Sequence, residues 1–173
     1  QERLAFGPAS PTHTTEEKYY ALIIGNSEYD DRRLDDLIAP VNDAKALNVV
    51  LKTKYGFETE LLLNATREEI FDKMQEMATK LNREDNLLIY YGGHGMYIQE
   101  QEIGYWLPID ADKDKRSQWI NTQTVAAEIK QAEAKHVLLI VDSCFSGSLT
   151  KSTTTNKNIN VKKGDKTWEK LKL

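Results

Sequence analysis

One histidine and one cysteine stand where an enzyme would place a reactive pair, each just beyond a short apolar run. His94 comes after the run 87–91, in the string Tyr-Tyr-Gly-Gly-His-Gly, and Cys144, the only cysteine, comes after the run 137–141, in the string Asp-Ser-Cys-Phe-Ser-Gly. A thiolate is a strong nucleophile, although a free thiol is mostly protonated near neutral pH. A nearby imidazole can accept the thiol proton and later protonate a leaving amine. These residue types predict nucleophilic catalysis by a Cys-His dyad.

The two apolar runs predict where the reactive residues lie in the fold. Both runs are typical of buried strands, and parallel strands of an α/β sheet bind ligands at their carboxyl ends. His94 and Cys144 should therefore meet at one edge of the sheet. The oxyanion of an acyl-transfer reaction needs rigid donors, which backbone amides in tight turns provide. The amides of Gly95 and Cys144 are the candidates for this oxyanion hole.

The remaining periodicity alternates between strand and helix, which predicts an α/β fold. Pro40 suits the first turn of a helix, and Gly56 follows the expected end of that helix. Thr66 and Glu69 form a capping box before the next helix. We expect strands over 20–24, 57–63, 86–91 and 137–141, helices over 40–55, from 67 onward and from 122 to about 134, and a small hairpin within 96–108.

Composition and charge exclude several other classes of protein. The 173 residues can bury one sizeable core, and the net charge of −4 argues against nucleic acid or an anionic membrane as partner. No apolar run is long enough to span a bilayer, and a single cysteine forms no internal disulfide. The chain starts at Gln1, which we interpret as a processed product or an excised fragment, and we favour a cytoplasmic location.

Four strings together resemble the large-subunit half of caspase-like cysteine peptidases. They are 20–26, 40–44 and the two strings around His94 and Cys144, and they resemble the branch of metacaspases, paracaspases and prokaryotic orthocaspases. His94 precedes Cys144 by 50 residues, a spacing known from caspases. The resemblance covers about 18–149. It implies a caspase-haemoglobinase fold, an α/β fold with a mostly parallel sheet flanked by helices on both faces.

The same resemblance implies the substrate preference. In metacaspases and paracaspases, the residues that match Asp43 and Asp142 line the S1 pocket, which binds the residue before the scissile bond (P1). Two carboxylates in a narrow pocket favour Arg or Lys at P1, with Arg preferred because its guanidinium binds bidentately. Each carboxylate also has a local alternative: Asp142 can cap its own turn, and Asp43 can interact with the dipole of its helix.

The chain divides into three parts by composition and resemblance. Residues 1–17 form a polar arm or linker, 18–149 the catalytic domain, and 150–173 a flexible inter-subunit linker with the possible start of a small subunit. A small-subunit chain or the C-terminal half of the same polypeptide should complete the fold, and a sensor or activator domain is a further expected partner. The linker is either a solvated loop or a site of self-processing of a zymogen. The candidate processing sites are Lys151, Lys157, Lys162, Lys163 and Lys166.

Calcium is the one cofactor that the resemblance raises. The loop 110–116 holds three aspartates but also three interspersed cations, which weakens a calcium site, so we expect no metal and no cofactor. The expected function is a cysteine endopeptidase that acts on proteins or peptides with Arg or Lys at P1. The alternative is a catalytically silent caspase-like scaffold. The intact dyad favours the enzyme.

Overall fold

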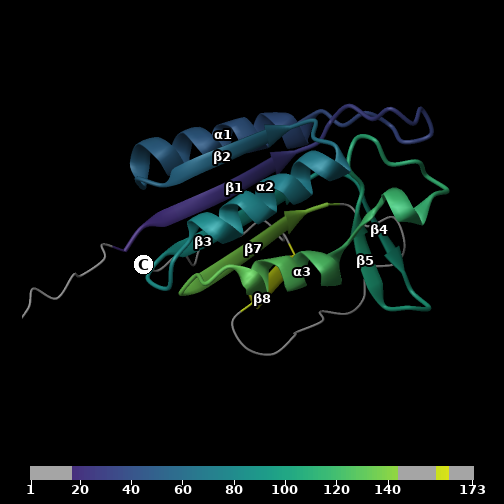
Figure 1. Cartoon of the computed structure of the whole chain (residues 1–173). Coiled ribbons are helices and arrows are strands. Elements are labelled where there is room, and N and C mark those ends of the chain that lie inside the picture. Colours follow the sequence, from purple (N-terminus) through teal and green to yellow (C-terminus); the bar gives the residue numbers. More distant parts are fainter. Residues whose placement is uncertain (1–16, 144–158, 164–173) are drawn as a thin grey trace, which may run out of the picture.

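Parallel strands form the central sheet of the computed structural model, which describes residues 17–143 and the strand 159–163 (Figure 1). The sheet has five strands in the order β2-β1-β3-β7-β8, and every neighbouring pair is parallel. Apolar runs buried on both faces are typical of such strands. Their bounds are β1 Tyr19–Gly25, β2 Glu58–Leu63, β3 Asn86–Gly92, β7 His136–Asp142 and β8 Ile159–Lys163.

Helices cover both faces of this sheet (Figure 1). Helix α1 (Ala39–Lys54) packs on one face, where Ala44 belongs to the same buried cluster as Ala21 and Ile23 of β1. Helices α2 (Arg67–Lys80) and α3 (Thr122–Gln131) pack on the other face, against a larger core. The alternation of side chains along each strand divides the two cores. The predicted fold class, a mostly parallel sheet with helices on both faces, is confirmed.

The helix starts follow the local sequence signals. Thr66 and Glu69 form the predicted capping box of α2, with the Glu69 amide donating to Thr66 Oγ1. Asn121 caps α3 by accepting a hydrogen bond from the Gln123 amide. Within the part of the chain that the structure describes, no helix is both long enough and apolar enough to cross a bilayer.

A second, smaller sheet stands beside the carboxyl ends of the main strands (Figure 1). Its strands are β4 (Gly95–Ile98), β5 (Ile103–Trp106) and β6 (Ile120–Asn121), all antiparallel. The predicted hairpin within 96–108 is confirmed as β4 and β5. The third strand was not predicted, because two residues are too few to show an alternating pattern. A short 3-10 helix (Arg116–Gln118) precedes it.

Strand β8 falls within the segment 150–173, for which the composition indicated a flexible linker. It pairs with β7 in parallel, and Lys162 and Lys163 lie opposite Ile140 and Val141. Backbone N–H and C=O groups form the hydrogen bonds between these strands. A strand with few apolar side chains can therefore pair with the open edge of the sheet at β7. Cleavage after Lys162 or Lys163 would require β8 to leave the sheet. The other candidate sites, Lys151, Lys157 and Lys166, lie outside the described residues.

Candidate active site

His94 lies in the turn between β3 and β4, and hydrogen bonds hold both its backbone and its ring. Its carbonyl accepts hydrogen bonds from the Tyr91 hydroxyl at 2.8 Å and from the Leu107 amide at 3.0 Å. Its ring nitrogen Nε2 lies 2.7 Å from the carbonyl oxygen of Asp35. A carbonyl oxygen only accepts, so Nε2 carries the proton and Nδ1 is left as the basic nitrogen of the neutral ring. The fold therefore sets the tautomer that a general base requires.

Tyr29 is a second residue that holds His94 in place, and no sequence motif marks it. The His94 amide donates to the Tyr29 hydroxyl at 2.7 Å, and the hydroxyl donates to the Asn26 carbonyl at 3.3 Å. The Tyr29 ring also packs against the imidazole, with 4.7 Å between ring centroids. Burial raises the pKa of Tyr29 to about 12, so the phenol stays protonated at neutral pH. Tyr29 is thus a positioning residue for His94.

Asn26 anchors the loop that carries these partners. It is fully buried, and its backbone amide donates to the Gly92 carbonyl at the end of β3. Its side-chain oxygen accepts from the Ala65 amide at 2.9 Å, and its side-chain nitrogen donates to the Ala65 carbonyl at 3.2 Å. The loop after β1, which holds both Tyr29 and Asp35, is therefore tied to two neighbouring segments of the chain.

The predicted acidic pair lies on the face of the sheet that α1 covers. Asp142 ends β7 and is opposite Gly92 of β3. Asp43 is the fifth residue of α1, and no acidic residue lies in the first turn of that helix. Asp43 therefore lies beyond the first turn, where the helix dipole has fallen off, so the alternative that Asp43 interacts with this dipole is wrong. Both carboxylates contribute to the raised pKa of Tyr90, after its burial, which indicates that both lie near the Tyr90 hydroxyl.

Neither of these carboxylates has a hydrogen bond or an ion pair with any residue of the described ranges 17–143 and 159–163. Turn capping by the Asp142 side chain is thus not seen there. Asp43 and Asp142 are exposed, so water can solvate them when no ligand is bound. Both carboxylates are thus without a cationic partner among the described residues.

Cys144 itself lies outside the described residues, and so does its amide. The strand that leads to it is described, and Asp142 is opposite Gly92 in the β3–β7 pair. Cys144 and His94 each come two residues after this pair, and the Gly93 amide donates to the Asp142 carbonyl at 3.4 Å. Gly95, the other candidate for the oxyanion hole, is buried at the start of β4. The ends of two adjacent strands thus lead to the two predicted catalytic residues.

Arg33 forms ion pairs with the acidic loop 110–116, the candidate calcium site. Its guanidinium forms an ion pair with Asp112 at 2.9 Å and another with Asp114. Asp110 lies apart from them and accepts a hydrogen bond from the Arg67 amide at the start of α2. A bound calcium ion needs these carboxylate oxygens free of competing cations. The residues present therefore do not fit a calcium site.

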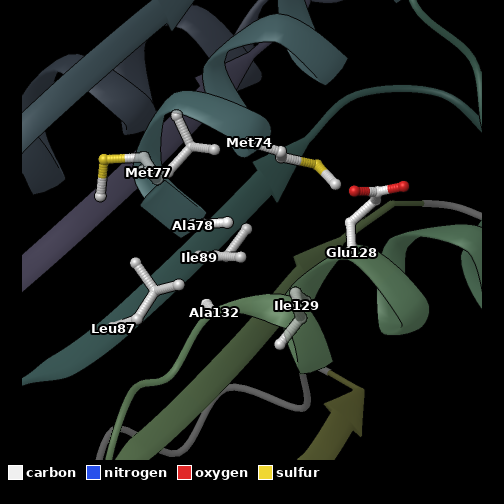
Figure 2. Close-up of a pocket in the computed structure, with 9 residues that line it drawn as sticks. Met74, Met77, Ala78, Leu87, Ile89, Glu128, Ile129 and Ala132 are labelled. Carbon is white, nitrogen blue, oxygen red and sulfur yellow. The ribbon is translucent and has the colours of Figure 1, made fainter. Parts of the chain in front are cut away.

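A small cavity lies on the opposite face of the sheet, away from the acidic pair. Figure 2 shows Met77 of α2, Ile89 of β3 and Ile129 of α3 around it. Its volume is about 10 Å³, which is too small for any substrate side chain and close to that of one water molecule. The lining is mostly apolar, so the cavity is a packing defect between the helices and the sheet.

Solved structures show the same fold. Protein GSU0716 from Geobacter sulfurreducens aligns with a TM-score of 0.62 and 23% identity, over 76% of this chain and 52% of that chain. The Drosophila initiator caspase Dronc aligns with a TM-score of 0.58 and 14% identity, over 71% and 47%. Pro-sf-caspase-1 aligns with a TM-score of 0.57 and 16% identity, over 98% and 61%. The fold is thus that of the caspase-like proteins, as predicted.

The sequence comparison gives the family. The caspase domain model matches residues 18–171, and the chain therefore belongs to the caspase domain family. The human mucosa-associated lymphoid tissue lymphoma translocation protein 1 is 28% identical over 125 residues, which cover 72% of this chain. The chain spans about 15% of the length of that relative.

Proposed function

We propose that this protein is a cysteine endopeptidase that cleaves after arginine or lysine with Cys144 as nucleophile and His94 as general base. The observation that carries the proposal is the hydrogen bond from His94 Nε2 to the Asp35 carbonyl. It leaves Nδ1 unprotonated on a half-buried ring, at the carboxyl ends of the strands that precede both residues. Membership in the caspase domain family supports the same chemistry.

The reaction follows the usual steps of acyl transfer. The Cys144 thiol gives its proton to His94 Nδ1, and its sulfur forms a bond to the P1 carbonyl carbon. The amides of Gly95 and Cys144 stabilise the resulting oxyanion. The C–N bond then breaks, the leaving amine takes the proton from His94, and a thioester remains. Water gives a proton to His94 and attacks the thioester, so that the thiolate leaves and regains its proton.

The acidic pair supports the preference for a basic P1 residue. Asp43 and Asp142 have no competing cation among the described residues and lie near the same hydroxyl, that of Tyr90. A guanidinium or ammonium group would bind between them, whereas an acidic P1 side chain would meet like charge. The resemblance to metacaspases and paracaspases implies the same preference for basic P1 residues. Protein or peptide substrates with Arg or Lys at P1 are the expected partners.

The solved structures that match extend well beyond the aligned part, since the chain covers 47% to 61% of them. We propose that a small-subunit half, in the same polypeptide or in a second chain, completes the substrate groove. Self-processing within 150–173 would then separate the two halves, and a sensor or activator domain would control the event. Lys151, Lys157 and Lys166 are the candidates that do not lie in β8.

The test compares fluorogenic peptides that carry Arg, Lys or Asp at P1, with the full-length protein and its Cys144→Ala variant. We expect cleavage after Arg and Lys, with Arg faster, and loss of all cleavage in the variant. Cleavage after Asp would keep the dyad and overturn the assignment of the pocket. A folded protein that cleaves none of the peptides, and whose Cys144 reacts with an alkylating peptide no faster than a free thiol, would be the silent scaffold instead.

Calcium should not be required for this activity. We expect kcat/KM for the arginine substrate to change by less than about twofold between millimolar calcium and an excess of chelator. The reason is that Arg33 already pairs with the Asp112 and Asp114 carboxylates. Steady-state assays with the full-length protein in both buffers test this expectation. Strong activation by calcium in the wild type would contradict it, and an Arg33→Gln variant would then show whether this loop is the site.

A further inference from the structure

Tyr90 is a buried polar residue that none of the catalytic steps uses. It lies on β3 two residues before Gly92, is 5% exposed, and packs in the core beneath α1. Its hydroxyl nevertheless reaches the end of the strand: a Cβ atom built at Gly92 would lie only 3.0 Å from it. The same Cβ atom would lie 3.4 Å from Cβ of Pro40 at the start of α1. The hydroxyl therefore fills the space that a side chain at position 92 would take.

The surroundings of this hydroxyl are acidic. Burial raises the pKa of Tyr90, and the charges of Asp142 and Asp43 raise it further, so the phenol remains protonated. Within the described residues the hydroxyl makes no hydrogen bond with either carboxylate or with any other group. The hydroxyl is not among the buried polar atoms that lack a partner in the described residues, so its oxygen can be reached by water or by a ligand. Tyr90 is thus an unpaired polar group beneath a pair of unpaired carboxylates.

We propose that the Tyr90 hydroxyl is the floor of the S1 pocket and selects arginine over lysine at P1. The inference rests on the proposed function, because it assigns a role within the same pocket. A guanidinium carries five N–H donors in a plane. Two carboxylates that each bind it bidentately accept hydrogen bonds from only four of them. The hydroxyl oxygen can accept a hydrogen bond from the remaining N–H group and donate its own proton to a carboxylate. A lysine ammonium has three donors, which the two carboxylates and water can satisfy without the hydroxyl.

Gly92 is part of the same proposed pocket floor. A larger residue at position 92 would press on the Tyr90 hydroxyl from the side of the pocket, because its Cβ atom would stand 3.0 Å away. Closer approach than ordinary van der Waals contact would displace the hydroxyl or the strand end. Glycine thus keeps the floor of the pocket open to the substrate. Gly92→Ala should therefore weaken the selection of arginine even though the hydroxyl is retained.

The experiment measures the ratio of kcat/KM for matched peptides with Arg and with Lys at P1. We expect Tyr90→Phe to lower this ratio roughly tenfold, mainly through loss of activity on the arginine peptide. The control is Tyr20→Phe, which removes a hydroxyl from an equally buried tyrosine on β1, in the core on the opposite face. Alkylation of Cys144 by iodoacetamide, which has no P1 side chain, should proceed at the same rate in both variants.

The outcomes separate this inference from the proposed function. An unchanged Arg-to-Lys ratio in a folded Tyr90→Phe protein would overturn the role of Tyr90 and leave the peptidase intact. A wild-type protein that cleaves neither peptide would overturn both. If Tyr90→Phe does not fold, Gly92→Ala decides: a lowered ratio supports the floor, and an unchanged ratio contradicts it.

Discussion

Replacing His94 with alanine is expected to lower kcat/KM for the arginine peptide by roughly 10⁴-fold. In the proposed mechanism the imidazole both removes the thiol proton and protonates the leaving amine, so both halves of the reaction depend on it. The fold presents the ring in one tautomer, because Nε2 lies 2.7 Å from the Asp35 carbonyl. Steady-state kinetics with the wild type and the variant give the ratio. Added imidazole should restore part of the activity if the missing group is only the base.

His136 provides the matched control for this variant. It is an exposed histidine at the start of β7, at the end of the sheet away from the predicted dyad. His136→Ala should therefore keep kcat/KM within about twofold of the wild type, as expected for a surface substitution. The assignment of His94 as the base fails if the folded His94→Ala protein retains more than about a tenth of the wild-type activity.

The elements that carry the site were predictable because their signals are local. The apolar runs before His94 and Cys144 gave β3 and β7, and the capping box at Thr66 gave the start of α2. Each of these signals lies within a few neighbouring residues. Once the strand order places β3 beside β7, the two reactive residues follow adjacent strand ends.

The partners of His94 were not predictable, because they come from distant parts of the chain. Asp35 lies 59 residues and Tyr29 lies 65 residues before His94 in the sequence. Asp35 acts through its backbone carbonyl, which every residue type possesses, so no motif marks it. Arg33 likewise meets Asp112 across 79 residues. Contacts of this kind arise only when the loop after β1 folds over the carboxyl edge of the sheet.

Strand β8 and Tyr90 were missed for other reasons. The composition around β8 predicts no core, but a strand at the edge of a sheet needs only backbone pairing on one side. Tyr90 belongs to an apolar run, where a tyrosine is typical of a buried strand. Only the proximity of its hydroxyl to Gly92 and to the two carboxylates separates it from ordinary core residues.

Removal of one carboxylate of the acidic pair should lower kcat/KM strongly, although less than removal of His94. We expect Asp142→Asn to lower kcat/KM for the arginine peptide by about 100-fold, because the P1 cation then loses one of its two charged partners. Asp43→Asn should act in the same direction. The control is Asp72→Asn, an exposed carboxylate on α2, which packs on the opposite face of the sheet.

The double variant Asp43→Asn/Asp142→Asn tests whether the two carboxylates bind one cation. If they share it, the loss in the double variant should be smaller than the product of the single losses, because the effects of groups in direct interaction are not additive. Independent effects would indicate that one carboxylate acts outside the pocket. Unchanged cleavage after arginine in both single variants would remove the acidic pair from S1, and the positive P1 side chain would then need another partner from beyond the described residues.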